Sequence, residues 1–224
     1  MEQTCAHALA VTAARARLLA MDMVHTAASG HIGGSLSVMD LLTTLYFHTM
    51  RVDPKDPKDP DRDRLVLSKG HCTPALYAVL ALKGYFPVED CKLFRSIKDH
   101  YSGHPDMKHV PGVDMSTGSL GQGISAAVGM ALAGKMDDRN YRVYAILGDG
   151  EIEEGQPWEA FMFAHHYKLD NLCVIIDNNG LQIDGAVDKV MSPYPIPDKL
   201  KAFGFAVKEI DGHDFDQMED AFAE

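Results

Sequence analysis

Two apolar runs with a helical segment between them place the strongest constraint on the fold of this 224-residue chain. Residues 142–147 read RVYAIL and residues 171–177 read NLCVIID, while residues 158–169 have the apolar spacing of a helix. Continuous apolar runs are typical of strands covered on both faces. Because parallel strands need a crossover connection, strands that alternate with helices indicate a parallel sheet. The sequence therefore predicts an α/β fold, a three-layer α/β/α arrangement around a mostly parallel sheet.

The same reading predicts further elements on both sides of this core. Strands are expected at 64–68 and 205–210. Helices are expected at 5–28, 38–48, 73–84, 124–136 and 198–203, with a last one opening near Asp214. Residues 53–63 carry three prolines and alternating charge, which predicts a surface loop. Residues 100–123 are rich in glycine and polar groups, and a loop of that length in a compact domain usually carries function.

Composition excludes several classes of function. The chain has 21 basic and 32 acidic residues, a formal net charge of −11, and no basic run, so nucleic acid is not an expected partner. It has neither an apolar window of about 18 residues nor a signal-peptide pattern, which indicates a cytoplasmic protein without a membrane span. Its four cysteines are far apart in the sequence, so neither a disulfide framework nor a zinc cluster is expected.

Polar residues follow two of the predicted strands directly. Asp149 lies in a Gly-Asp-Gly turn after the first apolar run, and Asn178 and Asn179 follow the second. In a parallel sheet both turns leave the same edge, where ligands usually bind. Carboxylate and amide oxygens suit Mg²⁺ or Ca²⁺. Gly148 and Gly150 would let the backbone approach a ligand closely.

The turn and the asparagine pair about thirty residues later resemble the thiamine diphosphate motif of thiamine-dependent enzymes. The rest of the chain resembles the diphosphate-binding domain of transketolase almost from end to end. The resemblance rests on six ordered segments: SGHIGGSLS, LSKGH, SGHPD, STGSLGQGISAAVGMALAGK, LGDGEIEEGQPWEA and DNNGLQIDG. It implies that residues 1–224 form this domain and that the pyrimidine-binding and C-terminal domains are absent from the chain.

The resemblance also implies a set of ligand-binding residues. The metal, Mg²⁺ with Ca²⁺ or Mn²⁺ as alternatives, would be bound by the side chains of Asp149 and Asn179 and the carbonyl of Leu181. Thiamine diphosphate would be contacted by residues from four segments: His71, Gly118, Leu120, Gly148, Asp149, Gly150, Glu154, Asn179 and Ile183.

Histidines and glutamates supply the proton-transfer groups that the resemblance implies. His31, His71 and His104 each follow a glycine, and they are expected to surround the reactive carbon of the cofactor and exchange protons with sugar hydroxyls. Glu154 is expected at a subunit contact, in a proton network between cofactor sites, and the role of Glu159 stays open. The other two glutamates after the Gly-Asp-Gly turn, Glu151 and Glu153, are interpreted as charges at the start of a helix. His100 and His213 are left without a role.

The implied activity is transfer of a two-carbon ketol unit from a ketose (phosphate) to an aldose (phosphate), as in the pentose phosphate pathway. Because the cofactor-activating glutamate lies in the pyrimidine-binding domain, the chain is expected to act with a partner subunit that carries this domain, in an α2β2 heterotetramer. A fragment of a full-length enzyme is the alternative origin. Alternative functions are another thiamine-dependent ketol transfer, on a sulfosugar, a branched sugar or dihydroxyacetone, and a non-catalytic assembly subunit of the same fold.

Overall fold

The computed structural model describes residue 1, residues 3–97 and residues 99–223, which divide into two compact units. Unit 1 comprises residues 1–62, 70–116 and 210–224, and unit 2 comprises residues 63–69 and 117–209. The chain therefore passes between the units four times. Within the described ranges, no helix combines the length and the apolarity needed to cross a membrane.

Unit 2 contains the predicted parallel sheet. Its strands, in the order β1-β2-β3, are β1 (Arg64–Leu67), β2 (Val143–Gly148) and β3 (Leu172–Asp177). Both pairings are parallel, and Gly148 at the end of β2 lies opposite Asp177 at the end of β3. Every residue of β2 is buried, as expected for a central strand that is covered on both faces.

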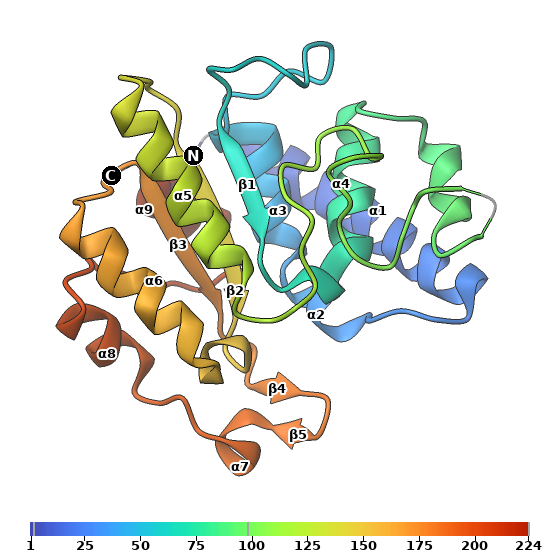
Figure 1. The fold of residues 1–224 in the computed structure, drawn as a ribbon. Helices are drawn as coiled ribbons and strands as arrows, with labels where there is room; N and C mark the ends of the chain where they lie inside the picture. The colour runs from blue at the N-terminus through green and yellow to red at the C-terminus, as the bar shows by residue number, and fades with distance from the viewer. Residues whose placement is uncertain (2, 98, 224) are drawn as a thin grey trace. The chain divides into compact units, whose positions relative to one another are not determined.

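Two helices cover one face of this sheet (Figure 1). They are α5 (Gly123–Met136) and α6 (Gly155–His166). Small residues let α5 approach closely: Ala127 and Ala131 are fully buried, and a Cβ atom on Gly134 would lie 2.8 Å from the ring of Tyr141. The helix predicted from its Ala and Gly content is thus confirmed, with its packing surface against the strands.

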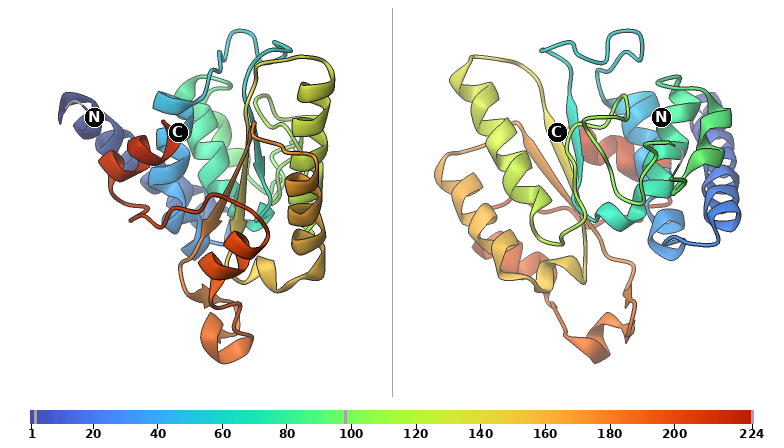
Figure 2. Two further views of the ribbon diagram at one scale, coloured as in Figure 1. Left: turned by 90° about the vertical axis from the view of Figure 1, so that its left-hand side faces the viewer. Right: turned by 45° about the vertical axis from the view of Figure 1, so that its right-hand side comes forward.

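A short arm follows β3, extending beyond the end of the sheet (Figure 2). It contains β4 (Leu181–Gln182), β5 (Gly185–Ala186) and α7 (Val187–Val190), and α8 (Ile196–Ala202) comes after it. The two strands pair antiparallel and form a small hairpin directly after the polar turn. This hairpin was not predicted, because strands of two residues carry no detectable apolar period.

The prediction of a strand at 205–210 is wrong. These residues are extended but belong to no sheet, because a strand exists only where a neighbour completes its ladder of hydrogen bonds. An open groove of about 1320 Å³ lies between the C-terminal half of α6 and residues 202–206. Leu172 of β3 also lines this groove, and all six residues of β3 are only half-buried although they are mostly apolar.

Unit 1 is helical, and α1 packs against α3 and α4. Its elements are α1 (Gln3–Ala27), α2 (Gly33–Ser37), α3 (Met39–Thr44), a π-helical turn η1 (Leu45–Thr49), η2 (Gly70–Cys72), α4 (Thr73–Lys83), η3 (Val88–Leu93) and α9 (Phe215–Phe222). The predicted helix at 38–48 is therefore α-helical only to Thr44. Gly84 ends α4 in a left-handed conformation with φ of 101°, as its position in the sequence predicted.

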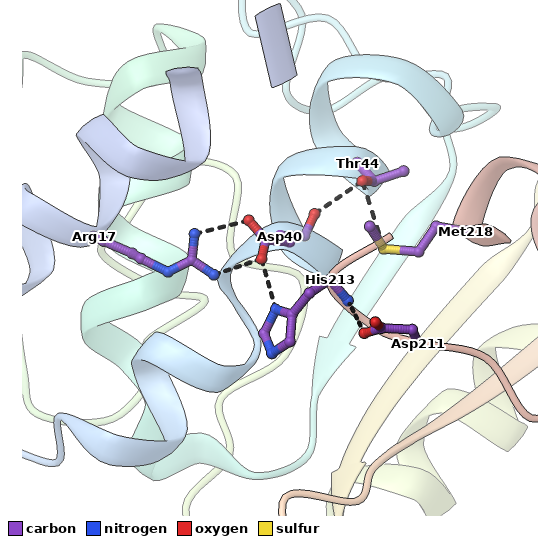
Figure 3. A network of polar contacts seen from close by, with 6 residues as sticks. All are labelled: Arg17, Asp40, Thr44, Asp211, His213 and Met218. Carbon is purple, nitrogen blue, oxygen red and sulfur yellow. Dashed lines mark hydrogen bonds and ion pairs between the residues drawn. The ribbon is translucent and has the colours of Figure 1, made fainter. Parts of the chain in front are cut away.

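An ion-pair network ties the C-terminal segment of unit 1 to two of its helices (Figure 3). Both carboxylate oxygens of Asp40 accept hydrogen bonds from Arg17, at 2.8 and 2.6 Å, and Oδ2 lies 2.7 Å from Nδ1 of His213. The hydroxyl of Thr44 donates to the Asp40 carbonyl and contacts the sulfur of Met218 on α9. His213, to which the sequence assigned no role, thus forms a structural contact.

Replacing Asp40 by Asn is expected to destabilise the chain by about 1–3 kcal/mol at pH 7, since a buried acceptor of charged hydrogen bonds is lost. Burial raises the pKa of Asp40, but the hydrogen bonds from Arg17 and His213 outweigh it and leave the pKa lowered. The stabilisation is therefore present above about pH 4, the ordinary carboxyl pKa, and is lost as the pH falls through the folded-state pKa.

Urea unfolding of parent and variant in a pH series from about 7 down to about 2 checks this: the difference in unfolding free energy should shrink steadily below the ordinary carboxyl pKa. Asp22→Asn, on the exposed face of α1, is the control and should show little difference at any pH of this series. A difference for Asp40→Asn that stays constant over this pH series would contradict the electrostatic explanation.

Candidate functional site

The turn after β2 and the turn after β3 are joined by hydrogen bonds. Oδ2 of Asp149 accepts a hydrogen bond from the backbone N–H of Gly180 at 2.6 Å, and Oδ1 accepts one from Gly150 at 2.9 Å. The Asp149 N–H donates to the carbonyl of Asp177 at 3.3 Å. Gly180 has φ of +73°, a conformation that favours glycine. The expected meeting of the two strand-end turns is confirmed.

The two asparagines of the second turn have different surroundings. Asn178 accepts a hydrogen bond from the hydroxyl of Tyr194 at 2.7 Å. Asn179 accepts one from the N–H of Leu181 at 3.0 Å and donates to Oδ2 of Asp177 at 3.3 Å. Of the two, Asn179 therefore lies within the polar cluster formed by the strand ends.

Burial dominates the electrostatics of Asp149, which is only 2% exposed. Desolvation raises its pKa, an effect that the hydrogen bonds from Gly180 and Gly150 oppose. The nearby charge of Asp177 raises this pKa further, and Lys69 lowers it. A desolvated carboxylate that retains unused lone pairs is a suitable partner for a cation.

The predicted metal ligands are all oxygen donors: one carboxylate (Asp149), one amide (Asn179) and one carbonyl (Leu181). This set fits a hard cation such as Mg²⁺. In the part of the chain that the structure describes, no group of three or more His, Cys, Asp or Glu side chains could hold a metal ion. Further ligands would therefore have to come from the metal's other partners, such as phosphate oxygens or water.

Lys69 is a buried cation near this turn that the sequence reasoning did not single out. It is 1% exposed, and its ammonium forms an ion pair with Oδ2 of Asp177. The lysine follows β1 by two residues and the aspartate ends β3, so the pair connects the outer strands of the sheet at one edge. Its signal in the sequence was its place in LSKGH, directly after a predicted strand.

The glycine-rich loop at residues 117–122 and the hairpin formed by β4 and β5 each have an apolar side chain at the surface. Leu120 is 39% exposed and Ile183 is 88% exposed. Gly118 has φ of +148°, which few residues other than glycine adopt. A Cβ atom on Gly148 or Gly150 would meet no protein atom closer than 3.4 Å, so packing within the chain does not require glycine at either position.

Four glutamates follow the Gly-Asp-Gly turn at residues 148–150, and one of them is buried, which the sequence did not indicate. Glu151, interpreted from the sequence as a helix-start charge, does begin a one-turn helix, but it is 2% exposed and accepts three hydrogen bonds. Glu153 is half-buried and accepts a hydrogen bond from Gln182 at 3.1 Å. Glu154 precedes α6 and Glu159 lies on it, and both are exposed. The burial of Glu151 could not be seen in the sequence, because two of its three donors lie far from it along the chain and the third ends the preceding strand.

Unit 1 brings together the histidines of the three glycine-histidine segments. The rings of His31 and His71 meet edge to face, with centroids 5.4 Å apart. The carbonyl of His104 accepts hydrogen bonds from Tyr77 at 3.3 Å and from Ser102 at 2.5 Å. Partial burial lowers the pKa of His104, and the charges of Arg95 and His31 lower it further. The lowered pKa favours the neutral form of His104, the form that can accept a proton.

His100 has contacts that explain it without a ligand. Its ring stacks on Tyr101, and Nδ1 lies 2.7 Å from a carboxylate oxygen of Asp99. Both histidines without a predicted role, His100 and His213, therefore have polar partners within unit 1.

Comparisons with known proteins identify the family of this chain. Residues 7–224 match the family described as "Transketolase, thiamine diphosphate binding domain". The 6-deoxy-6-sulfo-D-fructose transketolase subunit of Clostridium sp. (strain MSTE9) is 50% identical over 202 residues, covering 90% of this chain and 74% of that protein. One of the subunits of the apulose-4-phosphate transketolase of Phocaeicola vulgatus is 48% identical over 200 residues, covering 89% and 70%.

A solved structure confirms the fold class. The crystal structure of transketolase from Campylobacter jejuni matches with a TM-score of 0.90 and 37% identity, over 96% of this chain and 35% of that one. The chain thus spans about a third of the length of that enzyme. The described part has a parallel sheet with helices, in keeping with the predicted α/β class. This chain belongs to the transketolase family, in which it represents the thiamine diphosphate-binding domain.

Proposed function

We propose that this chain is the N-terminal subunit of a split transketolase, active only with a partner that carries a pyrimidine-binding domain. It would transfer a two-carbon ketol unit from a ketose (phosphate) donor to an aldose (phosphate) acceptor. The assignment as one part of a split enzyme is supported by two relatives that are named as transketolase subunits and are 50% and 48% identical. The cytoplasmic location expected from the sequence stays a prediction.

The observation that carries the proposal is the joining of the two strand-end turns through Gly180 and Asp149, at 2.6 Å. Side chains of Asp149 and Asn179 and the carbonyl of Leu181 would hold Mg²⁺, with Ca²⁺ or Mn²⁺ as chemically suitable substitutes. The metal would in turn bind the diphosphate of the cofactor. When bound, thiamine diphosphate supplies the carbon nucleophile that carries the two-carbon unit.

Other residues of the chain would hold the cofactor and move protons. Contacts to it are proposed for His71, Gly118, Leu120, Gly148, Gly150, Glu154 and Ile183. Exposure of Leu120 and Ile183 supports this role, as does the finding that packing within the chain does not itself require glycine at positions 148 and 150. His31, His71 and His104 would exchange protons with sugar hydroxyls, a role that the lowered pKa of His104 supports.

Assembly as an α2β2 heterotetramer is part of the proposal. Glu154 and Glu159 are exposed at the start and on the outer face of α6, where a second copy of the chain could cover them. Carboxylates brought together at such a contact would share a proton and join two cofactor sites. Light scattering of the chain with its partner should give a mass of two copies of each.

Titration of thiamine diphosphate and Mg²⁺ into the chain with its partner tests the enzymatic function against that of a non-catalytic assembly subunit. We expect heat of binding and a new circular dichroism band from the cofactor. A folded complex that gives neither signal would exclude the proposed function.

The substrate is expected to be revealed by a panel of ketose donors. The panel should contain 6-deoxy-6-sulfo-D-fructose, apulose 4-phosphate, dihydroxyacetone and fructose 6-phosphate, since the first two are named for relatives of nearly equal identity. We expect one donor to exceed the others in kcat/KM by at least about tenfold, a difference of about 1.4 kcal/mol in transition-state binding. Equal and negligible rates with every donor, in a complex that binds cofactor, would contradict a ketol transfer to an aldose.

A further inference from the structure

Glu151 is a buried carboxylate that none of the predicted roles uses. It begins the one-turn helix η4 (Glu151–Glu153), immediately after the Gly-Asp-Gly turn at residues 148–150. Its Oε1 accepts hydrogen bonds from the hydroxyl of Ser68 at 2.5 Å and from the N–H of Gly121 at 2.9 Å. Its Oε2 accepts one from the N–H of Gly148 at 3.1 Å. All three donors are neutral, so the carboxylate is held by hydrogen bonds and not by direct ion pairing.

The three donors come from three separate segments of unit 2. Ser68 follows β1, Gly148 ends β2, and Gly121 belongs to the loop that leads into α5. The carboxylate therefore joins two strand ends to the glycine-rich loop at 117–122. Neither strand end supplies a comparable contact to Gly121 among the hydrogen bonds of the described residues.

Close packing at the two ends of this loop shows how little it can shift without losing these bonds. At its start, the hydroxyl of Thr117 donates to the carbonyl of Leu67 at 2.6 Å. At its end, a Cβ atom on Gly123 would lie 2.7 Å from the Cα of Ser68, closer than real Cβ atoms approach. Between these points Gly121 has φ of +80°. Its bond to Glu151 holds this central part of the loop, next to a hydrogen bond that the side chain of Gln122 donates to Gln156.

We propose that Glu151 is a positioning residue for cofactor binding, whose carboxylate holds the 117–122 loop in register with the Asp149 turn. The proposal rests on the proposed function, because that function assigns Gly118 and Leu120 to the cofactor. Glu151 itself makes its contacts to protein groups, so it acts through the loop and not on the substrate.

Glu151→Gln is the test variant because it keeps the side-chain volume but replaces one acceptor oxygen by an NH₂ group. At the Oε1 position that group would face the N–H of Gly121 and the hydroxyl of Ser68, and at the Oε2 position it would face the N–H of Gly148. The bond to Gly121 is therefore either lost or weakened, because its acceptor is no longer charged. We expect hydrogen exchange in residues 117–122 of the free chain to rise by roughly 10-fold or more, with residues 143–147 unchanged. Glu153→Gln, which alters a carboxylate that bonds Gln182, is the control and should leave loop exchange unchanged.

Affinity for thiamine diphosphate is the second measurement, made in the presence of Mg²⁺ and the partner subunit. We expect it to weaken by roughly 10-fold to 100-fold in Glu151→Gln. Ser68→Ala, which removes one of the three donors, should produce a smaller change of the same kind in both measurements and serves if Glu151→Gln fails to fold. A role in stability alone would lower the unfolding temperature of the folded complex and leave its cofactor affinity unchanged.

Unchanged exchange in residues 117–122, or looser exchange with cofactor affinity within about 2-fold of the parent, would overturn the proposal. Failure of the parent complex to bind cofactor would overturn the proposed function, and with it the cofactor role of Glu151. Hydrogen exchange in the free chain needs no cofactor, so it still shows whether Glu151 anchors the loop at residues 117–122. A failure of the proposed function can therefore be distinguished from a failure of the role proposed for Glu151.

Discussion

Asp149→Ala is expected to abolish Mg²⁺-dependent binding of thiamine diphosphate while the chain stays folded. The loss should be at least about 100-fold, since even the outer partners of metal ligands change metal affinity by 10- to 100-fold. Removing this carboxylate stabilises the folded chain, because a buried charge is no longer desolvated, as the raised pKa of Asp149 reflects. It also destabilises the folded chain, because the Gly180 N–H loses an acceptor at 2.6 Å. These opposing effects should leave the net stability of the metal-free chain little changed. Calorimetric titration of the complex and thermal unfolding of the chain measure the two quantities.

Asp188→Ala is the matched control for this prediction. Asp188 lies on α7 of the same arm, is exposed, and pairs with Lys189 at 3.2 Å on the surface. Its loss removes the same charge and should change cofactor affinity by less than about 2-fold, because exposed pairs contribute little. Equal affinity of Asp149→Ala and the parent would show that the metal assignment is wrong.

Lys69→Met is expected to destabilise the chain by about 3–5 kcal/mol, the usual effect of removing one partner of a buried ion pair. The ammonium is 1% exposed and the Asp177 side chain 13%, so the carboxylate would lose its cation with little access to water. Asp149 would lose the same favourable charge, since Lys69 lowers its pKa. Urea unfolding at pH 7 measures the difference in free energy.

The double variant Lys69→Met/Asp177→Asn should recover part of this loss, because it also removes the carboxylate charge that the Lys69 ammonium balances. Lys189→Met, on the surface of α7, should cost less than about 1 kcal/mol. A loss for Lys69→Met as small as that of Lys189→Met would contradict the importance of the buried pair.

The sheet and most helices could be predicted because their signals are local. Apolar runs marked β2 and β3, and Gly84 marked the end of α4 through a left-handed conformation that few other residues adopt. The predicted strand at 205–210 failed because pairing depends on a neighbour, which no local pattern specifies. The π-helical turn after Thr44 failed for a related reason, since an apolar period does not distinguish it from an α-helix.

The site could be predicted where it followed from sheet topology. The meeting of Asp149 with the turn at Gly180 needs only that parallel strands end at one edge. Glu151 could not be predicted, because two of its donors lie 30 and 83 residues away and only the folded chain brings them to one carboxylate. In the sequence it looked like one of four similar acids near a helix start.

The half-buried strand β3 has a consequence for handling the protein. Among the described residues β3 pairs on one side only, so its other edge offers unpaired backbone groups on a mostly apolar strand. Such an edge can template pairing with further chains, a common origin of aggregation. The groove beside α6, which Leu172 of β3 also lines, adds further apolar side chains, among them Phe163, Phe203 and Phe205. Production of this chain together with whatever covers that side should therefore yield more monodisperse material than production of the chain alone.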